Sequence, residues 1–309
     1  IIDLNPNCSE AYFIFAMFYK KSENFELAIV NLNKAIELNH EFIDAYINLG
    51  NIFLHLKDTK SAILSYEKAI SIDNSIPELY FNLGKAFFES GNIKLAQDSY
   101  ESAILIKSDF IEAYTNLAVT YKSQNDIKSA IICYKKILDI RPNDSITLYN
   151  MGVLYQSIND FELALELYKK TIKINPEFYQ AFCNLGTIYQ AKGEFNLSVE
   201  NYKKAITINP IYPDALNNLA TVYKEKGDLD LAIKLYKKAI KILPSFTSAA
   251  YNLGIAFQEK GLYKNAIEAY KNAILLDPFH KESYNNLGNI FQEKGELDDA
   301  INLFRKALS

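Results

Sequence analysis

One pattern of residues recurs every 34 residues along this chain of 309 residues, and few folds accommodate such a repeat. In one copy, the small residue Ala220 is followed three residues later by Tyr223, and the small residue Ala232 is followed four residues later by Tyr236. Spacings of three and four residues place side chains on one face of a helix. The pattern therefore predicts two amphipathic helices in every repeat, and no segment shows the alternation typical of a strand.

Prolines define where each repeat closes. Five of them lie on one 34-residue lattice from Pro142 to Pro278, and the lattice continues back to Pro6. By this frame the repeats begin at residues 9, 43, 77, 111, 145, 179, 213, 247 and 281. Residues 1–8 match the tail of a preceding repeat, and the last repeat is truncated at Ser309. We therefore expect residues 1–309 to form a single solenoid domain that is a piece of a longer array or protein.

A period of 34 with these columns is typical of the tetratricopeptide repeat (TPR), a helix-turn-helix unit that stacks into a solenoid. The predicted fold class is all-α, an α-solenoid of tandem TPR repeats wound as a right-handed superhelix. In the turn, a glycine such as Gly227 ends the first helix, and a polar residue such as Asp228 can cap the second.

Composition and charge exclude several function classes. The formal net charge is −4, which gives no basic footprint for nucleic acid. No segment has the length and apolarity of a membrane-spanning helix. The three cysteines, Cys8, Cys133 and Cys183, are far apart and lack metal-ligand spacing, so we interpret them as free thiols in a reducing compartment, the cytoplasm or the nucleus.

The sequence offers no catalytic site in this segment. Histidine occurs only at His40, His55 and His280, and none has a carboxylate, cysteine or serine constellation around it. We therefore predict no catalytic residue, no metal site and no cofactor here, and an enzymatic activity only in a parent protein.

The clearest functional signal is a column of asparagines at the sixth position of the repeat. Asparagine costs a helix up to roughly 0.7 kcal/mol relative to alanine, so its recurrence calls for an offsetting role. The first repeat departs from the column with Ile14. The other eight repeats carry Asn48, Asn82, Asn116, Asn150, Asn184, Asn218, Asn252 and Asn286.

We interpret this column as a row of peptide clamps, because one amide can bond both the N–H and the C=O of a bound backbone. Stacked helices lie about 8–10 Å apart, so one asparagine would meet roughly every third residue of an extended peptide. An alternative is that each amide only bonds a neighbouring helix group or water. One turn earlier, an acidic column would favour basic or hydroxyl-bearing side chains: Glu10, Asp44, Glu78, Glu112, Asp214 and Glu282.

Two stretches carry a more specific resemblance. Ala45–Ile52 reads AYINLGNI and Asp214–Ala220 reads DALNNLA, with the asparagine directly before a Leu-Gly or Leu-Ala pair. These stretches resemble the TPR arm of nucleocytoplasmic O-GlcNAc transferases and of the related SPINDLY-type O-fucosyltransferases. The resemblance implies an inner surface that holds extended substrate proteins through the asparagines and acids, and a parent enzyme that uses a sugar nucleotide such as UDP-GlcNAc.

Other functions stay open at this stage. Without a catalytic domain, the same array would be a stand-alone scaffold or cargo receptor. In either case the expected partners are proteins or extended peptide segments, with no nucleic acid and no membrane. Pairing of two copies, through the outer faces or through the end repeats, is also left open.

Overall fold

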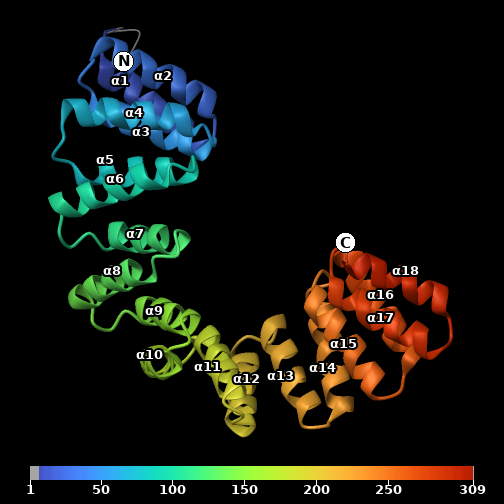
Figure 1. The fold of residues 1–309 in the computed structure, drawn as a ribbon. Helices are drawn as coiled ribbons and strands as arrows, with labels where there is room; N and C mark the ends of the chain where they lie inside the picture. Colours follow the sequence, from blue (N-terminus) through green and yellow to red (C-terminus); the bar gives the residue numbers. More distant parts are fainter. Residues whose placement is uncertain (1–6, 309) are drawn as a thin grey trace. The chain divides into compact units, whose positions relative to one another are not determined.

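The computed structural model describes residues 7–308, which form 18 α-helices and no strand (Figure 1). Most of the predicted tail, residues 1–6, lies outside the described residues. The first helices of the repeats are α1 (Ser9–Lys21), α3 (Ile43–His55), α5 (Pro77–Glu89), α7 (Ile111–Ser123), α9 (Ser145–Ser157), α11 (Tyr179–Ala191), α13 (Pro213–Glu225), α15 (Thr247–Glu259) and α17 (Lys281–Glu293). The second helices are α2 (Phe25–Leu38), α4 (Thr59–Ile72), α6 (Ile93–Ile106), α8 (Ile127–Ile140), α10 (Phe161–Ile174), α12 (Phe195–Ile208), α14 (Leu229–Ile242), α16 (Tyr263–Leu276) and α18 (Leu297–Leu308).

The helices form two compact units, and the division falls inside α9. Unit 1 ends at Thr147 and unit 2 begins at Leu148. Within each unit, a first helix packs against the second helix of its own repeat, as α5 does with α6. That second helix then packs against the next first helix, as α6 does with α7. The all-α solenoid fold is therefore confirmed, while one continuous domain over residues 1–309 stays a prediction.

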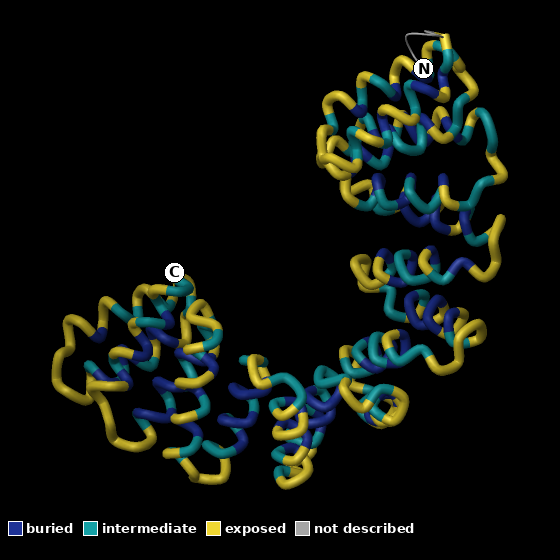
Figure 2. The backbone as a smooth tube through the Cα atoms, turned by 180° about the vertical axis from the view of Figure 1, so that it is seen from behind, coloured by how far each residue is buried: buried dark blue, intermediate teal, exposed yellow. Residues whose placement is uncertain are grey.

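A small residue facing a tyrosine builds the core of most repeats. A Cβ atom added to Gly50 would lie 2.6 Å from the Tyr66 ring, so only glycine allows this approach at the observed spacing. Tyr66 and Tyr270 are fully buried, as are the alanines Ala62 and Ala266 on the same helices. In Figure 2 the buried residues follow the faces along which the helices pack, and the turns are exposed.

The turn inside each repeat requires a left-handed backbone. Five turns use glycine there, for example Gly227 at φ 83° and Gly261 at φ 76°. The same position has positive φ in the turns without glycine, at Glu23, Lys57, Asn125 and Asn159. The repeat frame therefore fixes the turn geometry even where the residue disfavours it.

The caps of the second helices follow the sequence only in part. Asp228 accepts a hydrogen bond from the Leu231 backbone N–H at 3.1 Å, as predicted for a polar residue after the turn. Neither Asn92 nor Glu194 makes such a bond, and Leu262 has no polar side chain to offer. The predicted cap therefore forms at Asp228 but not at Asn92 or Glu194.

The first repeat exposes a surface that other repeats bury. The tenth residue of the repeat is 1% exposed at Ile52 and 0% at Val222, but Phe18 in the first repeat is 66% exposed. Phe15, one turn earlier, is also exposed. Association through this end of unit 1 stays a prediction.

Candidate functional site

The asparagine column lies on the first helices, where each side chain is only half-buried. Ile14, which replaces asparagine in the first repeat, is exposed. The acids one turn earlier are exposed in all six repeats that have them. We call the surface that carries both columns the first-helix face, and it is described separately in each unit.

In unit 2, asparagines of this column reach back to the residue 35 positions earlier, the fifth position of the preceding repeat. Asn184 Nδ2 donates to the Tyr149 hydroxyl at 3.3 Å, and Asn286 Nδ2 donates to the Tyr251 hydroxyl at 3.2 Å. Asn252 Nδ2 donates to Asn217 Oδ1 at 3.1 Å. These amides therefore link neighbouring repeats.

Asn218 follows the same geometry with a thiol as its neighbour. Burial raises the pKa of Cys183 to about 11, and hydrogen bonds with Tyr212 and Asn218 oppose that rise. Asn218 Oδ1 also accepts from Asn217 Nδ2 at 3.2 Å. In unit 2, the fifth position of one repeat thus supplies a polar partner for the asparagine of the next repeat. This holds for Asn184, Asn218, Asn252 and Asn286.

A buried tyrosine extends this network into the core of unit 2. The Tyr168 hydroxyl donates to Gln156 Oε1 at 2.7 Å and accepts from Asn184 Nδ2 at 3.1 Å. Tyr270 stands in the same relation to Gln258 and Asn286, at 2.8 and 3.4 Å. Because the hydroxyl proton goes to the glutamine, the tyrosine accepts from the asparagine. This leaves the asparagine Oδ1 as the atom available to a ligand.

In the first three repeats of unit 1 the fifth position is apolar, with Phe13, Ile47 and Phe81, and it offers no hydrogen bond. The fourth repeat has Thr115, whose hydroxyl donates to the Ile111 carbonyl of its own helix at 2.9 Å. Within the described residues, the Asn82 side chain has no hydrogen-bonding partner. Asn48 is different, because its Oδ1 accepts from Lys20 Nζ at 2.8 Å and its Nδ2 donates to the Asp44 carbonyl at 2.8 Å. Asn82 is therefore the amide of this column in unit 1 that is least committed to its own chain. In unit 2, Asn150 likewise has no hydrogen-bonding partner among the described residues.

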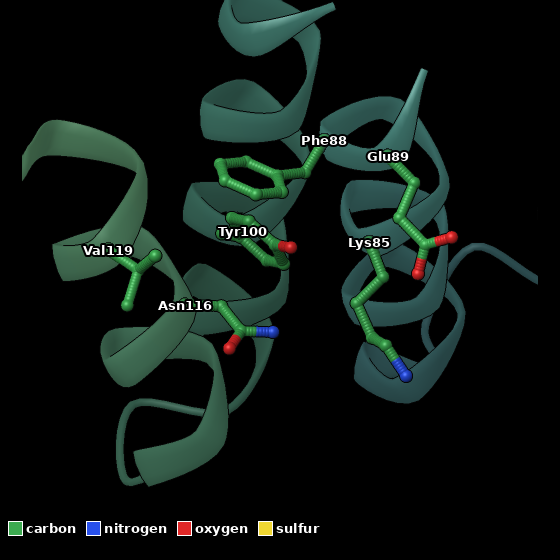
Figure 3. A pocket seen from close by; sticks show the side chains of 6 residues that line it. All are labelled: Lys85, Phe88, Glu89, Tyr100, Asn116 and Val119. Carbon is green, nitrogen blue, oxygen red and sulfur yellow. The ribbon is translucent and has the colours of Figure 1, made fainter. Parts of the chain in front are cut away.

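A cavity of about 160 Å³ lies on the first-helix face of unit 1 beside Asn116. Lys85 and Glu89 border one side and Asn116 and Val119 the other, with the rings of Phe88 and Tyr100 between them (Figure 3). Burial raises the pKa of Tyr100 to about 12, and a hydrogen bond with Asn116 opposes that rise. The cavity thus combines apolar walls with an amide, an ammonium and a carboxylate.

The acidic column faces solvent and has few partners. Glu78 Oε1 lies 3.9 Å from Lys107 Nζ, and Glu282 Oε2 lies 3.6 Å from His280 Nδ1. The pKa of Glu10 is lowered, first by its own backbone N–H and then by Ser9 and Cys8. These carboxylates therefore present negative charge one turn before the asparagines.

Sequence reasoning missed two contributors to this face. One is the aromatic residue at the fifth position: the centre of the Phe81 ring lies 5.2 Å from that of Phe110, and the centre of the Tyr149 ring lies 4.8 Å from that of Phe178. Both fifth-position rings pack against the residue that closes the same repeat. The tyrosine hydroxyls that hold Asn184 and Asn286 were also missed, although their 34-residue spacing is visible in the sequence.

The remaining candidate chemistry is weak. Cys8, Cys133 and Cys183 are free thiols, and burial raises the pKa of Cys133 to about 12, which disfavours the reactive thiolate. No group of three or more metal-ligating side chains occurs among residues 7–308. In the same range, no helix combines the length and apolarity that crossing a bilayer requires.

Family models identify the repeats along almost the whole chain. Models described as TPR repeat or tetratricopeptide repeat match segments that together run without a break from residue 18 to residue 309. They include residues 18–57, 77–110, 111–144, 145–178 and 246–309. The chain belongs to the tetratricopeptide repeat family.

Solved structures show similar arrays over part of the chain. A crystal structure of MamA is 31% identical over 52% of this chain and 95% of its own, with a TM-score of 0.48. A second MamA crystal structure is 30% identical over 55% of this chain and 93% of its own, with a TM-score of 0.47. YrrB, titled a TPR protein with an unusual peptide-binding site, is 22% identical over 60% of this chain and 96% of its own, with a TM-score of 0.48. No curated protein gives a match to the chain.

Proposed function

We propose that this TPR protein binds extended polypeptide along the asparagine column of its first-helix face. The observation that carries the proposal is Asn82, a half-buried amide with no hydrogen-bonding partner among residues 7–308. The Asn82 amide is not among the buried unsatisfied groups, so water can reach it, and a peptide N–H or C=O that replaces this water contributes about 0.5–1.5 kcal/mol to binding.

The two units offer different kinds of clamp. In unit 2 the amide nitrogens of Asn184 and Asn286 are bonded to tyrosines, so these residues offer a peptide mainly a carbonyl acceptor. In unit 1 Asn82 can offer both its donor and its acceptor. We therefore assign the stronger peptide contacts to unit 1, at Asn82 and at the cavity beside Asn116.

The surrounding charge favours a particular peptide. The exposed carboxylates of Asp44, Glu78 and Glu112 lie one turn before Asn48, Asn82 and Asn116. The peptide that suits this face is extended and rich in basic or hydroxyl-bearing residues, and it carries a small apolar side chain for the cavity lined by Phe88 and Val119.

A direct test uses a display library of unstructured peptides of about 12 residues, long enough to meet roughly four asparagines. Peptides selected on the full chain are then measured by fluorescence anisotropy. We expect Asn82→Ala and Asn116→Ala to weaken binding about tenfold each, as for a loss of about 1.4 kcal/mol. The matched control Asn265→Ala, on the exposed side of α16, should leave the affinity unchanged. Equal affinity of all three variants and the parent chain would refute the proposal.

A finer assignment rests on the sequence resemblance alone. In that interpretation the array is the substrate-recognition arm of a nucleocytoplasmic protein O-glycosyltransferase that uses a sugar nucleotide such as UDP-GlcNAc. The alternative is a scaffold or cargo receptor without a catalytic domain. The reading frame beyond Ser309 separates them: a two-lobed sugar-nucleotide domain supports the transferase, and further repeats followed by a stop codon support the scaffold.

A further inference from the structure

The second helices form another surface, and an apolar groove lies on it in unit 1. The groove has a volume of about 390 Å³ and lies between α6 and α8, with α7 as its floor. Leu105 on α6 is 87% exposed and Ile132 on α8 is 59% exposed. Tyr114, Leu117 and Tyr121 of α7 line the floor. We call this surface the unit 1 outer groove.

Unit 2 contains the equivalent groove four repeats later, and that groove is more polar, because four of its eight lining residues are polar or charged. It lies between α14 and α16, with a volume of about 320 Å³. The repeat frame places Glu268 where unit 1 has Ile132, and Lys241 where unit 1 has Leu105. The apolar lining in unit 1 is therefore not a general consequence of the repeat.

A lysine covers the aromatic floor of these grooves in unit 2. Lys237 Nζ lies 5.4 Å from the centre of the Phe257 ring. The same pairing, twenty residues apart, recurs at 5.9 Å for Lys169 and Tyr189 and at 5.8 Å for Lys203 and Tyr223. A cation over an aromatic face is attracted to it, so these rings in unit 2 are already paired with a cation of their own chain.

Unit 1 replaces that lysine with Glu101. Its Oε1 accepts a hydrogen bond from the Tyr121 hydroxyl at 2.9 Å, and no lysine covers the Tyr121 ring within the described residues. A carboxylate beside an uncovered aromatic ring matches a cation supplied from outside. The Tyr121 ring thus lacks the lysine that covers the equivalent ring in unit 2.

We propose that the unit 1 outer groove docks an amphipathic helix of a partner protein that carries a Lys or Arg one turn from apolar residues. The partner's cation would lie over Tyr121 beside Glu101, where unit 2 places its own lysine. Its apolar residues would pack against Leu105 and Ile132. Lys136, which also lines the groove, suits an acidic residue on the other flank of the partner helix.

The spacing of the walls favours a helix over an extended strand. Glu101 and Leu105 are four residues apart on α6, and Ile132 and Lys136 are four residues apart on α8. Each wall therefore alternates charge and apolar surface over one helical turn of about 5.4 Å. A docked helix presents side chains with the same repeat at its positions i and i+4.

The probe for the test is a stapled, fluorescein-labelled helical peptide of about 15 residues. It carries two leucines four residues apart, with a lysine one turn from them. Two control peptides have the same composition in scrambled order, or glutamate in place of that lysine. Anisotropy is measured with the full chain, and circular dichroism checks that each variant keeps its helices.

We expect the probe to bind at least tenfold more tightly than the scrambled peptide. Ile132→Glu, which installs the unit 2 residue, should remove that advantage. Glu101→Lys should weaken the lysine peptide and strengthen the glutamate peptide. The matched control Glu268→Gln in unit 2 should have no effect, and neither should Asn82→Ala, which separates this groove from the first-helix face.

Three results would overturn the proposal. They are equal binding of the probe and the scrambled peptide, unchanged binding to Ile132→Glu, and a loss on Glu101→Lys that the glutamate peptide does not reverse. Loss of probe binding through Asn82→Ala alone would move the helix to the first-helix face instead.

Discussion

Units 1 and 2 are built from the same 34-residue repeat motif, yet their first-helix asparagines have different hydrogen-bonding partners. In unit 2 the fifth position bonds the asparagine of the next repeat, as Tyr251 does for Asn286. In the first three repeats of unit 1 the same position is apolar, as at Ile47, and Asn82 has no partner among the described residues. A polar fifth position lets the next asparagine link two repeats. After an apolar fifth position, Asn82 is available to a ligand, whereas Asn48 bonds Lys20 instead.

The turns and the outer grooves of unit 2 also have more favourable local contacts than those of unit 1. Four of the left-handed turns in unit 2 use glycine, whereas unit 1 has Glu23, Lys57 and Asn125 beside its single Gly91. Unit 2 covers its outer aromatic residues with lysines, and unit 1 places Glu101 there. Unit 2 thus satisfies most of its first-helix asparagines and outer aromatic rings from within, with Asn150 and the buried Ser198 hydroxyl as exceptions among the described residues, and unit 1 leaves more surface for partners. Residues that leave such surface open commonly cost stability.

The largest expected effect is the loss of a core tyrosine. Tyr270→Ala in unit 2 and Tyr66→Ala in unit 1 should each destabilise the surrounding repeats by about 3–5 kcal/mol, as for other large buried aromatics. The unit 2 loss should exceed the other by about 1 kcal/mol, because Tyr270 bonds Gln258 and Asn286 whereas Tyr66 bonds only Asn51. Amide hydrogen exchange, measured separately for the amides of each unit, gives the loss of stability in both variants. Equal losses would show that the tyrosine–asparagine bond contributes nothing.

The asparagine column itself gives the next test. Asn286→Ala should destabilise unit 2 by about 1 kcal/mol, since two hydrogen bonds to tyrosines are lost and a better helix former is gained. Asn82→Ala should instead stabilise unit 1 by about 0.5 kcal/mol, because no bond within the chain is lost and alanine favours the helix. Amide exchange rates of the two variants measure these opposite changes in stability. Destabilisation by Asn82→Ala would mean that the Asn82 amide makes a hydrogen bond within the protein in solution.

Much of this architecture could be predicted from sequence because it depends on columns that repeat. The facing of Gly50 and Tyr66, the left-handed turn at Gly227 and the cap at Asp228 each follow from spacing and residue type. The links between Asn184 and Tyr149 depend on distances between repeats, which a single helix projection does not contain. The apolar outer groove of unit 1 is visible in the sequence only when the same repeat position is compared between repeats, as at Ile132 and Glu268.

A smaller effect is expected at the turns. Glu23→Gly should stabilise unit 1 by about 0.5–1 kcal/mol, because glycine removes the strain of the left-handed backbone at φ 58° but loses more entropy on folding. The converse change Gly227→Glu should destabilise unit 2 by a similar amount. Thermal unfolding together with exchange by unit measures both changes. If Glu23→Gly is neutral, the difference between the turns does not contribute to a difference in stability between the units.

The smallest expected effect concerns a helix start in unit 2 that lacks the side-chain cap found at the equivalent position in unit 1. Leu262 precedes α16 without a side-chain cap, whereas Asp58 in unit 1 accepts from the Ser61 backbone N–H at 3.1 Å. Leu262→Asp should stabilise unit 2 by about 0.5 kcal/mol, since the new carboxylate can bond a free N–H at the helix start. Asp58→Leu should cost unit 1 a similar amount. Because Leu262 is 40% exposed, little apolar burial is lost, and exchange of the first amides of α16 reports the gain. Unchanged exchange of these amides would mean that the turn cannot bring the new carboxylate within hydrogen-bond distance of the α16 N-terminus.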